Sequence, residues 1–142
     1  MLKNNDFIDK LRTSGLRPTK QRLKICEALF NREKTFHFTI KDLAENLSAQ
    51  LNEKISLATV YNTVHAFKDK GYLKEISINS DKSYFDTNTT NHHHFFDEDT
   101  NELIDCENDH IEPVNIIKNI TGKKINSVEV LIKVASDNQN QK

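Results

Sequence analysis

Four segments in the first half of the chain carry apolar residues at helical spacing. The spacing predicts helices over residues 6–12, 19–31, 39–47 and 56–70. In the last of these, Ser56 is a suitable N-cap and Gly71 follows the final turn. Its buried face is expected to comprise Leu57, Val60, Val64 and Phe67.

The hydrophobic period changes from helical to alternating after Gly71. Residues 72–78 alternate, and a polar turn at 79–81 precedes Tyr84 and Phe85, which predicts a β-hairpin. Three helices over residues 19–70 followed by a hairpin form the winged helix-turn-helix arrangement. Residues 56–70 are then the recognition helix, which enters the major groove of DNA.

The second half of the chain predicts a small mixed domain. Its expected elements are strands at 94–96 and 102–104 around a turn at 97–101, a short helix over 111–120, and a strand over 125–134. About 50 residues make a small core, so we expect dimerisation to complete it. The predicted fold class is α+β, with an N-terminal winged helix-turn-helix domain and a small C-terminal α/β dimerisation domain. The expected boundaries are 1–86 for the DNA-binding domain, 87–91 for a hinge and 92–142 for the dimerisation and sensing domain.

Composition indicates a globular protein, and charge is distributed unevenly between the two halves of the chain. The chain of 142 residues is 36% hydrophobic and 29% charged, and no apolar stretch suits a membrane helix or a signal peptide, so we expect a cytoplasmic protein without membrane contact. Residues 1–80 carry a net charge of +5 and residues 81–142 a net charge of −6. A basic first half suits contact with a polyanion, and the alternative is ordinary solvated surface.

The exposed face of the predicted recognition helix carries the side chains that would read DNA. It consists of Ser56, Ala58, Thr59, Tyr61 and Asn62. Tyr61 and Ala58 suit thymine methyl groups, and Asn62 suits an adenine edge. The basic residues expected to meet phosphates include Arg17, Lys20 and Arg22. The alternative is an ordinary amphipathic helix with a polar outer face.

Three consecutive histidines form the second group of candidate residues. In an extended segment His92 and His94 share one face and His93 takes the other. Two imidazoles on one face suit a metal ion, and Asp86 and His37 are further donors if the two domains fold together. Adjacent imidazoles can equally supply axial ligands to haem iron. The alternative is a histidine-rich polar loop.

Several motifs resemble the ferric uptake regulator superfamily from about residue 11 to residue 134. Residues 15–22 read GLRPTKQR and residues 55–64 read ISLATVYNTV, which are similar to the two DNA-binding signatures of the superfamily. The motifs YFDTNT at 84–89, HHHFF at 92–96 and NELID at 101–105 resemble its haem-responsive iron response regulator branch.

The resemblance implies a homodimer that binds palindromic double-stranded operators. It also implies an inter-domain metal site at His37, Asp86, His92 and His94, a second metal site at His93 and Glu112, and haem binding at His92, His93 and His94. By the family pattern, Tyr61 and Asn62 contact bases and Arg17 reaches a neighbouring minor groove. The chain departs from the wider family at the C-x-x-C pair, whose positions fall around Asp97 and Thr100, so we expect no structural zinc there. The position of the last histidine expected at the second metal site falls near Ser127, so His93 and Glu112 lack that partner.

The function expected from the sequence is iron-responsive transcription regulation, typically repression, with operator binding controlled by haem at the histidine cluster. Within the same superfamily, the alternative is a sensor of free divalent Fe, Mn or Zn. A small metallohydrolase is the alternative from another class. We expect no enzyme, because the chain has no H-E-x-x-H motif and only three glycines from which to build a phosphate-binding loop.

Overall fold

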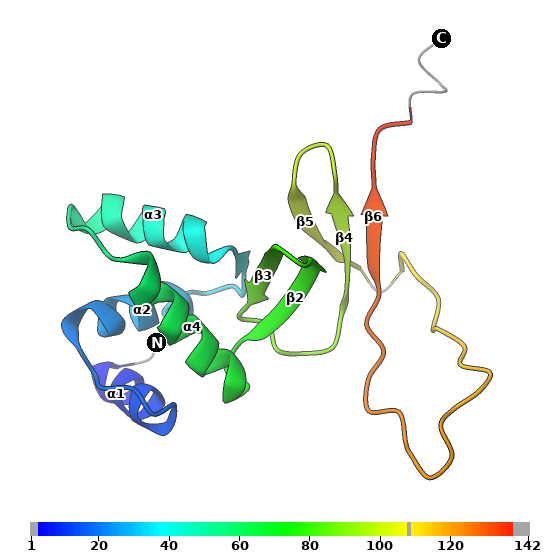
Figure 1. Ribbon diagram of the computed structural model, residues 1–142, viewed down its shortest axis with the longest axis horizontal. Coiled ribbons are helices and arrows are strands. Elements are labelled where there is room, and N and C mark those ends of the chain that lie inside the picture. The colour runs from blue at the N-terminus through cyan, green and yellow to red at the C-terminus, as the bar shows by residue number, and fades with distance from the viewer. Residues whose placement is uncertain (1–2, 108, 138–142) are drawn as a thin grey trace. The chain divides into compact units, whose positions relative to one another are not determined.

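Helices and a small sheet build the first unit of the computed structural model, Met1–Thr89, of which residues 3–89 are described (Figure 1). The second unit is Thr90–Lys142, in which residues 90–107 and 109–137 are described. The division falls inside the segment 87–91 that the sequence assigns to the hinge. Residues 1–2, 108 and 138–142 of the expected domains lie outside the described residues.

The four helices expected from the apolar spacing are confirmed. They are α1 (Asn4–Thr13), α2 (Lys20–Phe30), α3 (Ile40–Leu51) and α4 (Leu57–Asp69). The last three begin at a hydroxyl N-cap, because the side chains of Thr19, Thr39 and Ser56 accept the backbone N–H three residues later. None of the described helices is long and apolar enough to cross a membrane.

The sheet of the first unit contains the predicted hairpin and one strand that the sequence analysis missed. The hairpin strands are β2 (Lys74–Asn79) and β3 (Lys82–Asp86). The additional strand, β1 (His37–Phe38), lies between α2 and α3, and it pairs antiparallel with β3. Two residues are too few to show an alternating pattern, so only the pairing with β3 reveals this strand.

The core of the first unit lies where the helices meet, and it corrects the expected burial of one residue of α4. Val60, Val64 and Phe67 are buried as expected, but Leu57 is 56% exposed. Thr63 is buried in addition, with its hydroxyl donating to the Thr59 carbonyl at 2.8 Å. Periodicity identifies the inner face of a helix but not where along the helix its neighbours end.

Cys26 of α2 behaves as a core residue. It is buried beside Ile25 and Leu29, and burial raises the pKa of its thiol to about 12. The thiol is therefore protonated and packs as a small apolar group.

Among the described residues of the second unit, the helices and strands are limited to one three-stranded sheet. The strands are β4 (His93–Asp97), β5 (Glu102–Cys106) and β6 (Leu131–Val134), in the order β5-β4-β6. Strand β4 pairs antiparallel with β5 and parallel with β6. In the turn between β4 and β5, the Asp97 carboxylate accepts the backbone N–H groups of Asp99 and Thr100.

Two predictions for the second unit are wrong. Residues 111–120 form no helix, and the final strand begins at Leu131 instead of residue 125. The segment 111–120 is rich in Ile, Val and Asn, which are weak helix formers, and helices this short are marginal without a packing partner. Its apolar side chains are mostly exposed, so the single chain does not supply that partner.

Candidate functional site

The outer face of α4 presents most of the residues predicted to read DNA. Tyr61 is 52% exposed, and Ser56, Ala58 and Asn62 are exposed as well. Thr59 is half-buried, and its hydroxyl lies 2.8 Å from the Ser56 hydroxyl. An exposed tyrosine beside an exposed asparagine gives this face both an apolar and a hydrogen-bonding surface, as base-edge readout requires.

The basic residues of α2 lie beside this face. A hollow of about 500 Å³ is lined by Arg17, Thr19, Lys20, Gln21, Arg22 and Thr59. The Arg22 guanidinium donates to the Arg17 carbonyl at 3.0 Å, which holds Arg22 at the start of α2. A helix N-terminus with added cationic side chains attracts phosphate. The structure therefore brings Arg17, Lys20 and Arg22 together with Thr59 of α4.

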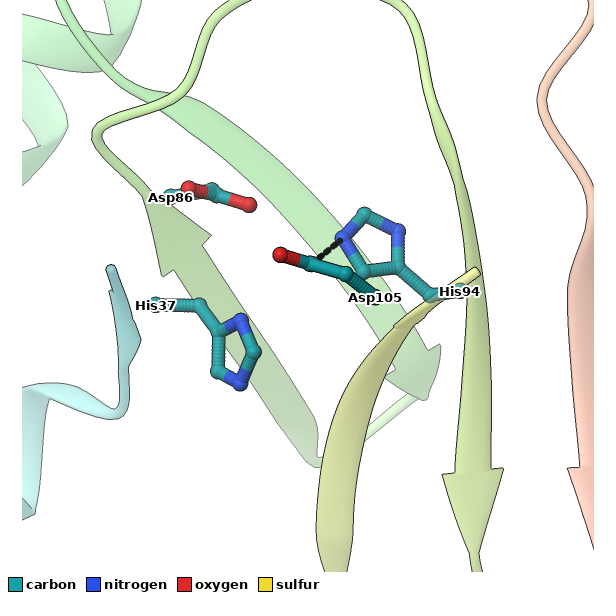
Figure 2. A group of neighbouring side chains, drawn as sticks. All are labelled: His37, Asp86, His94 and Asp105. Carbon is teal, nitrogen blue, oxygen red and sulfur yellow. Dashed lines mark ion pairs between the residues drawn. The ribbon is translucent and has the colours of Figure 1, made fainter. Parts of the chain in front are cut away.

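In the first unit, His37 and Asp86 form a pair of candidate metal ligands. They are direct partners in the β1–β3 register, and Figure 2 shows both side chains. The pairing continues at Thr87, whose backbone N–H donates to the Phe36 carbonyl at 3.0 Å and whose hydroxyl accepts the Phe36 N–H at 2.9 Å.

Asp86 is a buried carboxylate, with only 2% of its surface exposed. Its Oδ1 accepts the Asn88 N–H at 2.8 Å. Lys74 is its partner on β2, and burial lowers the pKa of Lys74, an effect that the negative charge of Asp86 partly opposes. A buried carboxylate of this kind is stabilised by positive charge, including that of a metal ion.

In the second unit, His92, His94 and Asp105 form a group of three donors. Asp105 Oδ1 lies 3.5 Å from His92 Nε2 and 3.3 Å from His94 Nε2, and Figure 2 shows the pair made with His94. The two imidazole rings are 4.3 Å apart between centroids. His92 Nδ1 lies 2.8 Å from the Thr90 carbonyl, which orients its ring. Because both imidazoles approach the same carboxylate, His92 and His94 lie on one face, as alternation along an extended segment predicts.

Asp105 is the candidate ligand that the sequence analysis missed. It is the register partner of His94 across the β4–β5 hairpin. The turn expected at 97–101 would place residue 104 opposite residue 94, whereas the observed register pairs Asp97 with Glu102 and so brings Asp105 opposite His94. In the sequence analysis Asp105 belongs only to the family motif at 101–105 and is not identified as a neighbour of the histidines.

The residues expected at the second metal site lie apart from this group. His93 points to the other face of β4, and its Nδ1 accepts the Val130 N–H at 2.9 Å. Glu112 is exposed in the irregular segment that follows β5. Among the described residues, neither belongs to a group of three or more neighbouring His, Cys, Asp or Glu donors. His93 instead joins β4 to the chain leading into β6.

Comparison with known proteins agrees with this fold. The family described as the ferric uptake regulator family matches residues 13–134. The peroxide-responsive repressor PerR of Staphylococcus aureus is 35% identical over 102 residues, which cover 72% of this chain and 67% of the relative.

Solved structures of the family show the same fold. The ferric uptake regulator of Vibrio cholerae is 26% identical, with a TM-score of 0.66 over 91% of this chain and 98% of the other. The manganese-containing ferric uptake regulator of Pseudomonas aeruginosa is 23% identical, with a TM-score of 0.64 over 96% and 98% of the two chains. The chain belongs to the ferric uptake regulator family, and it is a metal-responsive transcription regulator and not an enzyme.

Proposed function

We propose that this regulator senses a free divalent ion, Fe, Mn or Zn, through His37, Asp86, His92, His94 and Asp105. The observation that carries the proposal is the Asp105 carboxylate held between the imidazoles of His92 and His94. A mixed set of imidazoles and carboxylates without a thiolate suits these borderline ions. The family resemblance supports placing the pair from the first unit and the three donors from the second in one inter-domain site.

A metal ion that binds donors on both units restrains the segment 87–91 between them. Such an ion changes operator affinity only if it binds the DNA-binding arrangement more or less tightly than the alternatives. A coupling free energy of roughly 1 to 3 kcal/mol is typical of such regulation. The ion thus supplies positive charge and a geometric restraint, and the protein converts them into a change in operator binding.

The operator is double-stranded DNA, which we propose is palindromic because the regulator acts as a homodimer. A two-fold symmetric dimer presents its two α4 helices to two equivalent half-sites. In each half-site, Tyr61 and Asn62 contact base edges, while Arg17, Lys20 and Arg22 contact phosphates or the adjacent minor groove.

The second copy covers the apolar segment that follows β5. Ile117 is 94% exposed and Ile120 is 73% exposed, and Val114, Ile116 and Ile125 lie in the same stretch. Contiguous exposed apolar side chains of this kind mark an interaction surface. A partner also supplies the packing that residues 111–120 need to become regular.

Replacing Ile117 with aspartate is expected to weaken the dimer at least about tenfold, because burying an isoleucine contributes roughly 1.5–3 kcal/mol. Sedimentation equilibrium of the full-length protein measures the dissociation constant. Asn115→Asp is the matched control, since it adds the same single negative charge at a nearby exposed position that is polar. Equal weakening in both variants would indicate that charge, and not an apolar contact, is responsible.

Haem remains the second candidate signal, because of the consecutive residues His92, His93 and His94 and the resemblance to the iron response regulator branch. Asp105 separates the two candidates. As a ligand to a divalent ion it contributes to binding, whereas an imidazole that ligates haem iron must leave the Asp105 carboxylate.

Asp105→Asn is therefore expected to lower the affinity for Zn²⁺ or Mn²⁺ about 10- to 100-fold. The affinity is measured by competition with a fluorescent chelator, and operator binding is measured with and without the ion. His110→Ala is the control, because His110 is an exposed histidine outside the donor group. The signal would be haem and not a divalent ion if two results were obtained. Ion affinity would be unchanged in Asp105→Asn, and haem would give a saturable Soret shift that is lost in His92→Ala/His93→Ala/His94→Ala.

A further inference from the structure

Tyr61 is the exposed end of a line of aromatic rings that crosses the first unit. Its ring lies 4.1 Å from the imidazole of His65, measured between centroids, with an angle of 37° between the planes. The same imidazole makes an edge contact with the ring of Phe85, with 5.3 Å between centroids and 76° between the planes. Phe85 is buried on β3 and stacks on Phe38 at 6.1 Å. The side chain of His65 thus lies between an exposed ring and a rigid buried one.

The spacing of Tyr61 and His65 explains their contact. They are four residues apart on α4, so their side chains project from the same face on successive turns. His65 is half-buried, and its own ring is held by Phe85. A ring anchored in this way restricts the rotamers open to its neighbour.

We propose that His65 is a positioning residue for DNA recognition, holding the ring of Tyr61 in the orientation that it presents to the major groove. The proposal rests on the function proposed above, in which α4 is the recognition helix. An exposed tyrosine without support loses side-chain freedom when it docks, and this loss weakens binding. Contact with His65 restricts the rotamers of Tyr61 in the free protein, so Tyr61 loses less conformational entropy when DNA binds.

The surroundings of His65 indicate that its ring, and not its charge, is what matters for Tyr61. Glu75 of β2 interacts with His65 electrostatically, and this carboxylate already pairs with Lys68 of α4 at 3.2 Å. Glu75 also accepts the Ser83 hydroxyl at 2.7 Å, and this hydrogen bond is the main reason that its pKa is lowered. A phenyl ring in place of the imidazole is therefore expected to keep the function.

The test uses a duplex that the metal-loaded, full-length wild-type protein selects from random sequences. Thymines of this duplex are replaced one at a time by deoxyuridine, which removes only the methyl group that an apolar side chain contacts. Loss of one contacted methyl is expected to weaken binding about fourfold per half-site. Tyr61→Ala identifies the thymine concerned, because this variant no longer distinguishes thymine from uracil there.

His65→Ala is expected to reduce the thymine-to-uracil preference at that position towards one, while His65→Phe retains it. Thermal unfolding of both variants checks that the fold is intact. The ring-proton shifts of Tyr61 report the stacking directly, and they are expected to move in His65→Ala more than in His65→Phe.

Three outcomes would overturn the inference. The first is an unchanged preference in His65→Ala, and the second is a preference lost equally in the alanine and phenylalanine variants. The third is a Tyr61→Ala variant that alters no thymine position, because His65 would then have no base contact to position. Failure of the wild-type protein to select any duplex would instead count against the DNA-binding function of α4.

Discussion

Replacing Phe67 with alanine is expected to lower the free energy of unfolding by about 3–5 kcal/mol. The side chain is completely buried, and its ring makes edge contacts with Phe30 at 5.5 Å and with Tyr72 at 6.0 Å. Removing it leaves a cavity between α2, α4 and the chain that follows α4. The loss is a large share of the roughly 5–15 kcal/mol that stabilises a typical domain. Urea denaturation of the full-length protein, followed by circular dichroism, measures the change.

Leu57→Ala on the same helix is the control for this experiment. Leu57 is apolar and lies on the stripe expected from helical periodicity, but it is 56% exposed. Its replacement is expected to change the free energy of unfolding by no more than about 0.5 kcal/mol. A destabilisation similar to that of Phe67→Ala would mean that Leu57 packs in the core, as the sequence pattern suggests.

Asn62→Ala is expected to weaken binding to the selected operator about 5- to 150-fold per half-site. This range corresponds to the roughly 1–3 kcal/mol of discrimination from one bidentate contact with a base edge. Asn62 is exposed on the outer face of α4, so its replacement leaves the core unchanged. Fluorescence anisotropy measures affinity for the operator and for an unrelated duplex of equal length.

The change should affect specific binding and leave non-specific binding nearly unaltered, because Asn62 carries no charge for the phosphate backbone. Asn46→Ala provides the matched control, since Asn46 is an exposed helical asparagine on α3. Equal losses for the operator and the unrelated duplex would show that Asn62 does not read bases.

The sequence predicts local features of the fold well where many residues share one pattern. The helices were correctly located because apolar residues recur over several turns and hydroxyl residues precede three of them. The strand β1 was missed because two residues carry no period. The helix over 111–120 was wrongly predicted because spacing shows which side chains share a face but not whether anything covers that face.

The candidate site shows the same division between local and long-range information. The common face of His92 and His94 follows from alternation along one strand, and both approach Asp105. Asp105 itself depends on the register of a second strand, which the sequence analysis did not carry through. The pairing of His37 with Asp86 joins residues that are distant in sequence, and it requires the β1–β3 ladder.

The sequence by itself predicted a winged-helix regulator of transcription, with α4 as its expected recognition helix and histidines as its candidate sensor. These properties reside in periodicities and motifs that each span only a few turns or strands. The tertiary structure alone decided that Leu57 is exposed, that Asp105 joins His92 and His94, and that His65 stacks on Tyr61 against Phe85. Burial, strand register and ring contacts depend on which distant segments pack together, and a local sequence pattern does not show which segments these are.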